Sequence, residues 1–272
     1  MTGRLLVGIS GWSYARWRGD FYPADLPQRR ELEYAAARMS SVELNGSFYS
    51  LQRPSSYRAW AKQTPPDFVL AVKGSRFITH LKRLVDVEQP LANFFASGVL
   101  ALGPKLGPLL WQLPERMAYD REVVGRFLDL LPRTTVEAAA LASRHDDRVP
   151  RDRAWVEPGA DRALRHALEF RSPTFDDARL YDQLADHGVA CVLADTAGQW
   201  PEVERDTADF RYVRLHGDSQ LYTSGYSDEA LDAWAERFLA WAGAGDVHCY
   251  FDNDAHGHAP HDALRLLARL AD

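Results

Sequence analysis

Two hydrogen-bonding cations stand close together in an otherwise apolar run, Tyr212-Val213-Arg214-Leu215-His216-Gly217. The run is rich enough in apolar residues to form a buried strand, and side chains two residues apart in a strand share one face. Arg214 and His216 therefore point to the same side, just before Gly217 lets the chain turn away. A guanidinium can hold an anion and an imidazole can move a proton, so the pattern predicts a pocket at this strand end.

Polar side chains end most of the other apolar runs too. They are Glu43, Asn45, Lys73, Gln112, Glu169, Arg171, Asp195, Asp252 and Asn253. Only one of Asp252 and Asn253 can face inward, and we expect Asn253 to do so. Such a mixture of charges is costly to bury unless the charges are paired. The sequence therefore predicts one shared pocket, and the alternative is a salt-bridge network that plugs the same space.

The pocket residues suggest two sets of roles. We expect the catalytic groups to be Glu43, Glu169, Asp195 and His216, with Glu43 or Glu169 as general base and His216 as general acid. We expect the ligand-binding groups to be Trp12, Tyr14, Asn45, Lys73, His80, Gln112, Arg171, Arg214 and Asn253. Within this set, Lys73, His80, Arg171 and Arg214 would hold the anion.

Two loops supply part of the second set. The stretch SGWSYARWRGDFYP carries Trp12 and Tyr14 among several aromatic residues, which would form a stacking wall or else a lid on the protein's own core. The stretch KGSRFITHLKRL carries Lys73, Arg76 and His80. These cations form a local basic cluster in a chain of formal net charge -6, and a net charge of this sign argues against a broad nucleic-acid-binding surface.

The elements that must position these residues alternate between apolar runs and helical patterns. The expected strands are residues 5–10, 41–45, 68–73, 108–113, 166–171, 190–195, 212–217 and 247–253. Runs so apolar are typical of a parallel sheet covered on both faces. Eight of them in 272 residues predict a single α/β domain, a (β/α)8 TIM-type barrel over residues 1–272, with an open doubly wound sheet as the alternative.

Residues 133–165 interrupt the alternation, and their many charges predict an inserted helix followed by a solvated loop. Asp120 and Ser227 are expected N-caps.

The first strand is followed by no G-x-G-x-x-G turn, so no nucleotide cofactor is expected. A divalent metal held by some of Glu43, Glu169, Asp195 and His216 stays an option. The N-terminus and the longest apolar stretch are too short for a signal peptide or membrane span, which predicts a cytoplasmic protein.

Several stretches together carry a family resemblance: GISGWSY, VELNGSFYSLQRPSSYRAW, LGPLLWQLP, YVRLHG and YFDND. Over nearly its whole length the chain resembles the DUF72 family of YecE-like proteins. The resemblance implies a TIM-type barrel and signature positions at Glu43, Asn45, Lys73, His80, Gln112, Glu169, Arg171, Asp195, Arg214, His216 and Asn253. It implies no activity. Ser172 and Phe175 stand where the family usually has His and Trp.

The functional expectation is an enzyme that acts on a small anionic or phosphorylated ligand, most simply a hydrolase of a phosphate ester or phosphodiester. A nucleic-acid end is a further ligand of this kind. The alternatives are a glycosidase, with Glu43 and Glu169 as its carboxylate pair, and a non-catalytic binding protein. In the binding protein, the acids would be paired with arginines and would leave no free base.

Overall fold

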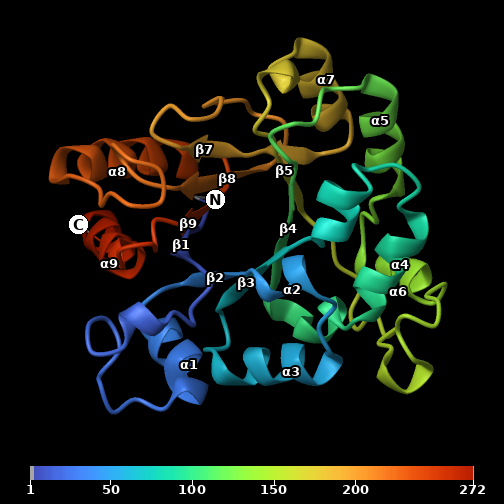
Figure 1. Ribbon diagram of the computed structural model, residues 1–272, viewed down its shortest axis with the longest axis horizontal. Helices are drawn as coiled ribbons and strands as arrows, with labels where there is room; N and C mark the ends of the chain where they lie inside the picture. The colour runs from blue at the N-terminus through green and yellow to red at the C-terminus, as the bar shows by residue number, and fades with distance from the viewer. Residues whose placement is uncertain (1–2, 272) are drawn as a thin grey trace.

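A computed structural model describes residues 3–271, and its core is a ring of parallel strands surrounded by helices (Figure 1). The strands are β1 (Leu5–Ser10), β2 (Ser41–Leu44), β3 (Val69–Lys73), β4 (Leu106–Gln112), β5 (His166–Glu169), β6 (Val189–Cys191), β7 (Leu193–Asp195), β8 (Phe210–Leu215) and β9 (Asp246–Phe251). Each overlaps one of the expected runs. The α/β barrel predicted from the alternation is confirmed.

The sheet closes through one strand that changes partners. The strand order is β6-β5-β4-β3-β2-β1-β9-β8-β7, so the two ends of the sheet, β6 and β7, follow each other in the chain. Only Val192 separates them, and its N–H donates to the carbonyl of Leu168 in β5. β6 pairs with β5 and β7 pairs with β8. The single expected strand at 190–195 is therefore two short strands, because its two halves bond to different neighbours.

Helices cover the outside of the ring. They are α1 (Glu31–Ala36), α2 (Gly46–Tyr49), α3 (Pro54–Gln63), α4 (Glu88–Ala96), α5 (Arg121–Leu130), α6 (Thr135–Ala142), α7 (Ala178–Asp186), α8 (Asp228–Ala242) and α9 (His258–Leu270). The predicted N-caps are confirmed, because the side chain of Asp120 accepts from two N–H groups of α5 and that of Ser227 from Ala230. A π-helical turn, η3 (Phe77–Leu81), follows β3 and carries His80. No helix within residues 3–271 is long and apolar enough to cross a membrane.

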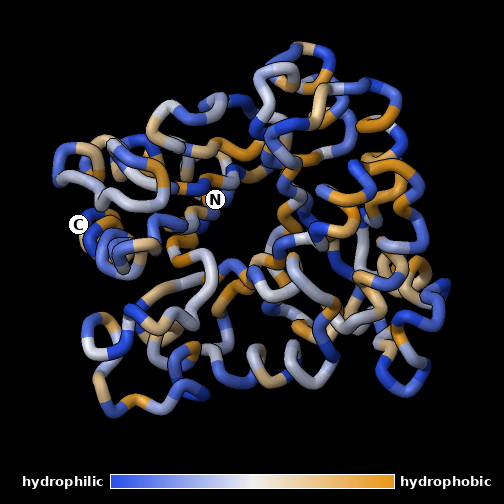
Figure 2. The backbone as a smooth tube through the Cα atoms, viewed as in Figure 1, coloured by the Kyte–Doolittle hydropathy of each residue, from blue (hydrophilic) through white to orange (hydrophobic). Residues whose placement is uncertain are grey.

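Two apolar layers hold the ring in place. The larger one lies between the strands and the helices, and a smaller one fills the barrel interior around Tyr212 and Tyr250. Figure 2 shows hydrophilic stretches mainly on the outer loops and hydrophobic stretches along segments that face the sheet. Cys191 and Cys249 are buried and unbridged, as expected of core cysteines.

The segment 133–165 is only partly the solvated excursion that its charges suggested. Its helix, α6, buries Ala138, Leu141 and Ala142 and packs against α4. The N–H of Trp155 donates to the carbonyl of Ala96, so the loop is also tied to α4. The apolar stretch TVEAAALA outweighs the charges around it, because one covered helix face is enough to dock a helix.

Gly8 marks a close approach between strands at the barrel wall. It lies in register with Ser41 of β2 and Tyr250 of β9. A Cβ at this position would overlap the backbone carbonyl of Ser41, which no rotamer change can relieve.

We therefore expect Gly8→Ala to lower the free energy of unfolding by about 1–3 kcal/mol, the usual cost of overpacking. Gly125→Ala is the matched control, because Gly125 lies inside α5 and a Cβ there meets only the flexible amide of Gln183. This control should be neutral or stabilising by up to about 1 kcal/mol, from helix propensity. Urea denaturation of both variants measures the difference, and equal stability of the two would contradict the interpretation.

Candidate functional site

Arg214 forms the centre of a buried charge network at the carboxyl end of β8. Its side chain is completely buried. Nε and Nη2 donate to the two oxygens of Glu43, at 3.1 and 3.0 Å. Nη1 donates to Glu169 at 2.8 Å, and Nη2 also donates to Asp252 at 2.8 Å. One guanidinium thus joins the ends of β2, β5 and β9.

Glu43 is held on every side. Besides Arg214, the hydroxyls of Ser10 and Tyr212 donate to its carboxylate, at 2.5 and 2.7 Å. The residue is 0 % exposed. With four donated hydrogen bonds and no face open to solvent, Glu43 anchors Arg214 and has no free oxygen for a substrate. The structure does not support its expected role as general base.

Glu169 is equally occupied. Nη1 of Arg214 and Nε of Arg171 donate to its two oxygens, at 2.8 and 3.1 Å. Burial alone would raise the pKa of Glu169, but the charges of Arg214 and Arg171 outweigh it and lower the pKa to about 2. The carboxylate is therefore ionised and a very weak base at neutral pH.

His216 lies behind the same network. Its Nδ1 is 3.1 Å from Asp252, but the two groups are not aligned as a hydrogen bond. Burial lowers the pKa of His216, and the nearby carboxylate of Asp252 offsets this only in part. A neutral, fully buried imidazole does not serve well as the general acid that we expected. Gly217 follows with φ +131°, which gives the turn predicted after His216.

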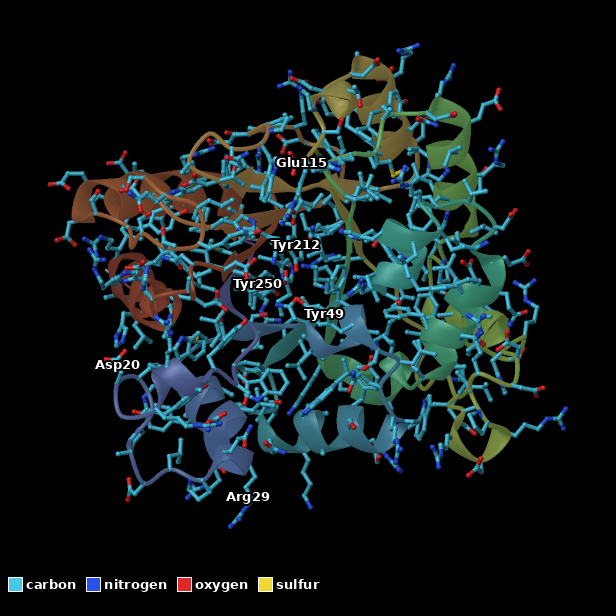
Figure 3. All side chains as sticks on the ribbon, viewed as in Figure 1. Asp20, Arg29, Tyr49, Glu115, Tyr212 and Tyr250 are labelled. Atoms are coloured by element: carbon cyan, nitrogen blue, oxygen red, sulfur yellow. The ribbon has the colours of Figure 1, made fainter. Side chains whose placement is uncertain are left out.

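A cavity of about 580 Å³ opens above this network, at the carboxyl ends of the strands. Its lining residues are Tyr14, Asn45, Phe48, Tyr49, Lys73, Arg76, His80, Gln112, Arg171, Tyr222, Asp252 and Asp254. Figure 3 shows Tyr49, Tyr212 and Tyr250 near the centre of the barrel, whereas Asp20 and Arg29 lie at its periphery. The sequence-predicted residues that meet at this cavity are therefore Tyr14, Asn45, Lys73, His80, Gln112 and Arg171.

The cavity has two chemically different walls. Lys73, Arg76 and His80 come from β3 and the turn after it, and Arg171 comes from the end of β5. Asp252 and Asp254 follow β9, on the opposite side of the ring. We call the first set the basic wall and the two aspartates the acidic wall.

Lys73 is the buried cation of the basic wall and has no ion-pair partner among the described residues, whereas Arg76, also unpaired there, is exposed. Within residues 3–271, no carboxylate lies within ion-pair distance of its amine, and Nζ lies 4.7 Å from the ring centre of Phe48. Burial, and then the charge of Arg214, lower the pKa of Lys73 to about 8. The neighbouring His80 has its pKa lowered to about 4, by burial and then by Lys73, so it is neutral at pH 7.

Arg171 and the amides complete the lining. The guanidinium of Arg171 stacks 3.7 Å from the ring centre of Trp200 and donates to the hydroxyl of Tyr222 at 3.0 Å. Asn45 donates to Ser10 at 2.8 Å, and its buried Oδ1 has no partner among the described residues. These contacts fix the direction of each group toward the cavity.

Three predicted site residues lie elsewhere. Trp12 packs edge-on against Trp60, with 5.6 Å between ring centres, so it belongs to the lid that was the alternative to a stacking wall. Asp195 accepts a hydrogen bond from Tyr226 at 2.9 Å, outside the cavity lining. Asn253 donates to Asp262 and to the carbonyl of Ser224, both at 2.9 Å.

The expectation that Asn253 faces inward is wrong, and Asp252 takes that place. Tyr250 faces the barrel interior, and Asp252, two residues on, continues that face. Alternation along β9 was the signal that could have decided this. Phe48 and Tyr49 carried a weaker signal, because they lie in the short segment α2 that follows β2. Tyr222 carried none, since it lies in a long loop after β8.

A metal centre does not fit the side chains present. Across residues 3–271, no group of three or more His, Cys, Asp and Glu side chains is placed to hold a metal ion. The carboxylates considered for that purpose, Glu43 and Glu169, already accept from Arg214. His261, in the first turns of α9, pairs with Asp20 at 2.9 Å.

Removal of the Arg214 charge should destabilise the fold strongly. In Arg214→Met, three carboxylates would share a buried space with no guanidinium, and breaking such a network typically costs about 3–5 kcal/mol. Arg269→Ala is the control, because Arg269 pairs with the exposed carboxylates of Asp228 and Asp232 and should cost about 0–1 kcal/mol. Urea denaturation of both variants at pH 7 tests this, and a loss below 1 kcal/mol for Arg214→Met would contradict it.

Comparisons with known proteins agree with this architecture. The chain matches the family described as "Protein of unknown function DUF72" over residues 6–272. It is 26% identical to the UPF0759 protein YunF of Bacillus subtilis, over 98% of this chain and 94% of that protein. A match to the UPF0759 protein YecE of Escherichia coli is 28% identical and covers 47% of this chain and 44% of that protein.

Solved structures give the same result. A DUF72 family protein from Thermotoga maritima superposes with a TM-score of 0.78 at 25% identity, covering 99% of this chain and all (100%) of that one. A second, from Enterococcus faecalis, superposes with a TM-score of 0.75 at 15% identity, over 98% and 96% of the two chains. The family match over residues 6–272 shows that the chain belongs to the DUF72 family, and the solved structures agree with its fold.

Proposed function

We propose that this protein is an enzyme that binds a small phosphorylated ligand at the mouth of the barrel, and most simply a hydrolase of a phosphate ester or phosphodiester. The observation that carries the proposal is the basic wall. Three cations and a neutral imidazole converge on one cavity in an acidic chain, and Lys73 there has no carboxylate partner. An unpaired buried cation is costly, and a bound anion would remove that cost.

The proposed roles follow from which groups are free. Lys73, Arg76 and Arg171 would hold the phosphate oxygens, and neutral His80 would donate to one of them. Asp254 faces them and forms no ion pair among the described residues. Burial, and then the charge of Asp252, raise the pKa of Asp254, which suits a general base for an attacking water.

The two alternatives differ in their support. A glycosidase needs two free carboxylates, but Glu43 and Glu169 are joined through Arg214. A non-catalytic binding protein accounts for these paired acids. It does not account for Asp254, which faces the basic wall unpaired. The enzyme is therefore the better supported reading, and turnover is the property that separates it from a binding protein.

Ligand binding and turnover test the proposal together. A phosphorylated ligand at about 100 times its Kd should stabilise the fold by about 2.7 kcal/mol, visible as a higher Tm. The panel comprises inorganic phosphate, sugar phosphates, a short oligonucleotide with a terminal phosphate, and neutral sugars. Arg76→Ala should weaken binding about tenfold or more, because a hydrogen bond to a charged group contributes about 1.5–3 kcal/mol. Arg126→Ala, in an exposed pair with Glu122, should change nothing.

Asp254→Asn should keep binding and lower turnover of the stabilising ligand at least a hundredfold, the usual scale of general-base catalysis. Stabilisation by neutral sugars alone would overturn the anion site. Binding without any turnover by the unaltered protein would establish the binding-protein alternative.

Anion binding should also depend on pH through Lys73. Its amine is charged below its pKa of about 8, so its contribution is complete at pH 7 and is lost as the pH rises through 8. A phosphate ester is already a dianion over this range. We expect affinity to fall about tenfold between pH 7 and pH 9.5, the loss of roughly one charge-assisted hydrogen bond.

Lys73→Arg keeps a cation at every pH in this range and should remove the pH dependence. Calorimetric titration at both pH values measures the effect. An unaltered protein whose affinity stays constant from pH 7 to pH 9.5 would exclude Lys73 from the anion site.

A further inference from the structure

We propose that Lys73 is a carbonyl-reactive amine, and that its Nζ forms an imine with an aldehyde or ketone group of the ligand while Arg76 and Arg171 hold the ligand's anionic group. The position of the anionic group rests on the function proposed above, and the imine itself does not. Lys73 contacts the anionic group in its protonated form and attacks the carbonyl group in its neutral form, so the two roles belong to different protonation states of one amine. The ligand class is therefore a small phosphorylated aldehyde or ketone.

The choice of cation at position 73 is the first observation. The chain has 28 arginines and only 4 lysines: Lys62, Lys73, Lys82 and Lys105. Lys105 is bound to the carbonyls of Ala61 and Thr64, and Lys62 is exposed. Lys73 alone lines the cavity. Arginine would serve a simple anion contact, whereas only lysine offers an amine that can lose its proton and form a covalent bond.

The setting of the amine is the second observation. Lys73 ends β3, and its backbone carbonyl accepts from Ser47 at 2.6 Å, which fixes the base of the side chain. The amine lies beside the ring of Phe48 and has no ion-pair partner in the described part of the chain. Groups that act on its charge come from several strands. They are Arg214 on β8, Glu43 on β2, Glu169 on β5 and Asp252 after β9. A desolvated amine beside a fixed cation is the usual arrangement of an imine-forming lysine.

The acidic wall supplies the proton transfers that an imine needs. The lone pair of neutral Nζ attacks the carbonyl carbon, the C–O π bond breaks, and one N–H proton passes to the oxygen to give a neutral carbinolamine. Asp254, whose pKa is raised by burial and then by Asp252, protonates the departing hydroxyl, which leaves as water. The C=N bond forms as the nitrogen loses its second proton, and hydrolysis reverses each step. No oxidant or reductant is required.

Reductive trapping tests the inference on the unaltered protein. Glycolaldehyde phosphate is added with cyanoborohydride, whose hydride converts the imine carbon to a secondary amine. Peptide mass spectrometry then locates the added mass, which is that of the aldehyde less one oxygen atom. We expect Lys73 to be labelled at least ten times faster than Lys62, Lys82 and Lys105, which are the internal controls in the same sample. Inorganic phosphate should slow labelling at Lys73 only.

Neutral glycolaldehyde separates the two parts of the inference. It should label Lys73 at least tenfold more slowly than the phosphorylated aldehyde does, because it lacks the anionic group. Equal labelling of Lys73 by both aldehydes would keep the reactive amine and overturn the anion anchor, and with it the proposed function. Labelling of Lys73 no faster than that of Lys62 would overturn the imine. Phosphate-dependent stabilisation in that case would leave the proposed function standing.

Discussion

The buried guanidinium of Arg214 is the interaction on which the mouth of the barrel depends. It is 0 % exposed, and it donates to carboxylates at the ends of three different strands. Three acids that would repel one another are thereby held within hydrogen-bond distance of one side chain. Glu43 also accepts from Ser10 and Tyr212, and Glu169 also accepts from Arg171, so these two carboxylates are held rigidly from more than one side. The network forms the floor on which the cavity rests.

The charge network of this floor determines which charged groups remain free to line the cavity. Glu43 and Glu169 are used up in holding Arg214, so the groups that remain open are those above them, on the basic and acidic walls. Arg214 also places a fixed charge near Lys73, and together with burial this charge lowers the pKa of the amine. Arg214 therefore has two effects: it pairs with the carboxylates of the floor, and it lowers the pKa of Lys73, the one lysine that lines the cavity.

The likeness to DUF72 structures extends over the whole barrel. It establishes the fold but does not indicate an activity. Barrels of this type place ligand-contacting residues at the carboxyl ends of their strands, and loops there vary while the frame persists. In this chain, π-helical turn η3 brings Arg76 and His80 toward the cavity. The loop after β8 brings Tyr222 to the same place. Function must therefore be argued from these side chains.

The sequence by itself determined the strands, the β/α alternation and the caps at Asp120 and Ser227, because apolar runs and capping residues act locally. It also determined that polar side chains gather at the strand ends. Only the tertiary structure decided how they pair. Glu43 and Arg214 are 171 residues apart in the chain. Their bond depends on the closure of the ring, which no local pattern encodes. Ring closure likewise placed Asp252 on the cavity and left Asp195 and Asn253 outside it. The direction in which a side chain points at a strand end depends on how the neighbouring strands pack around it.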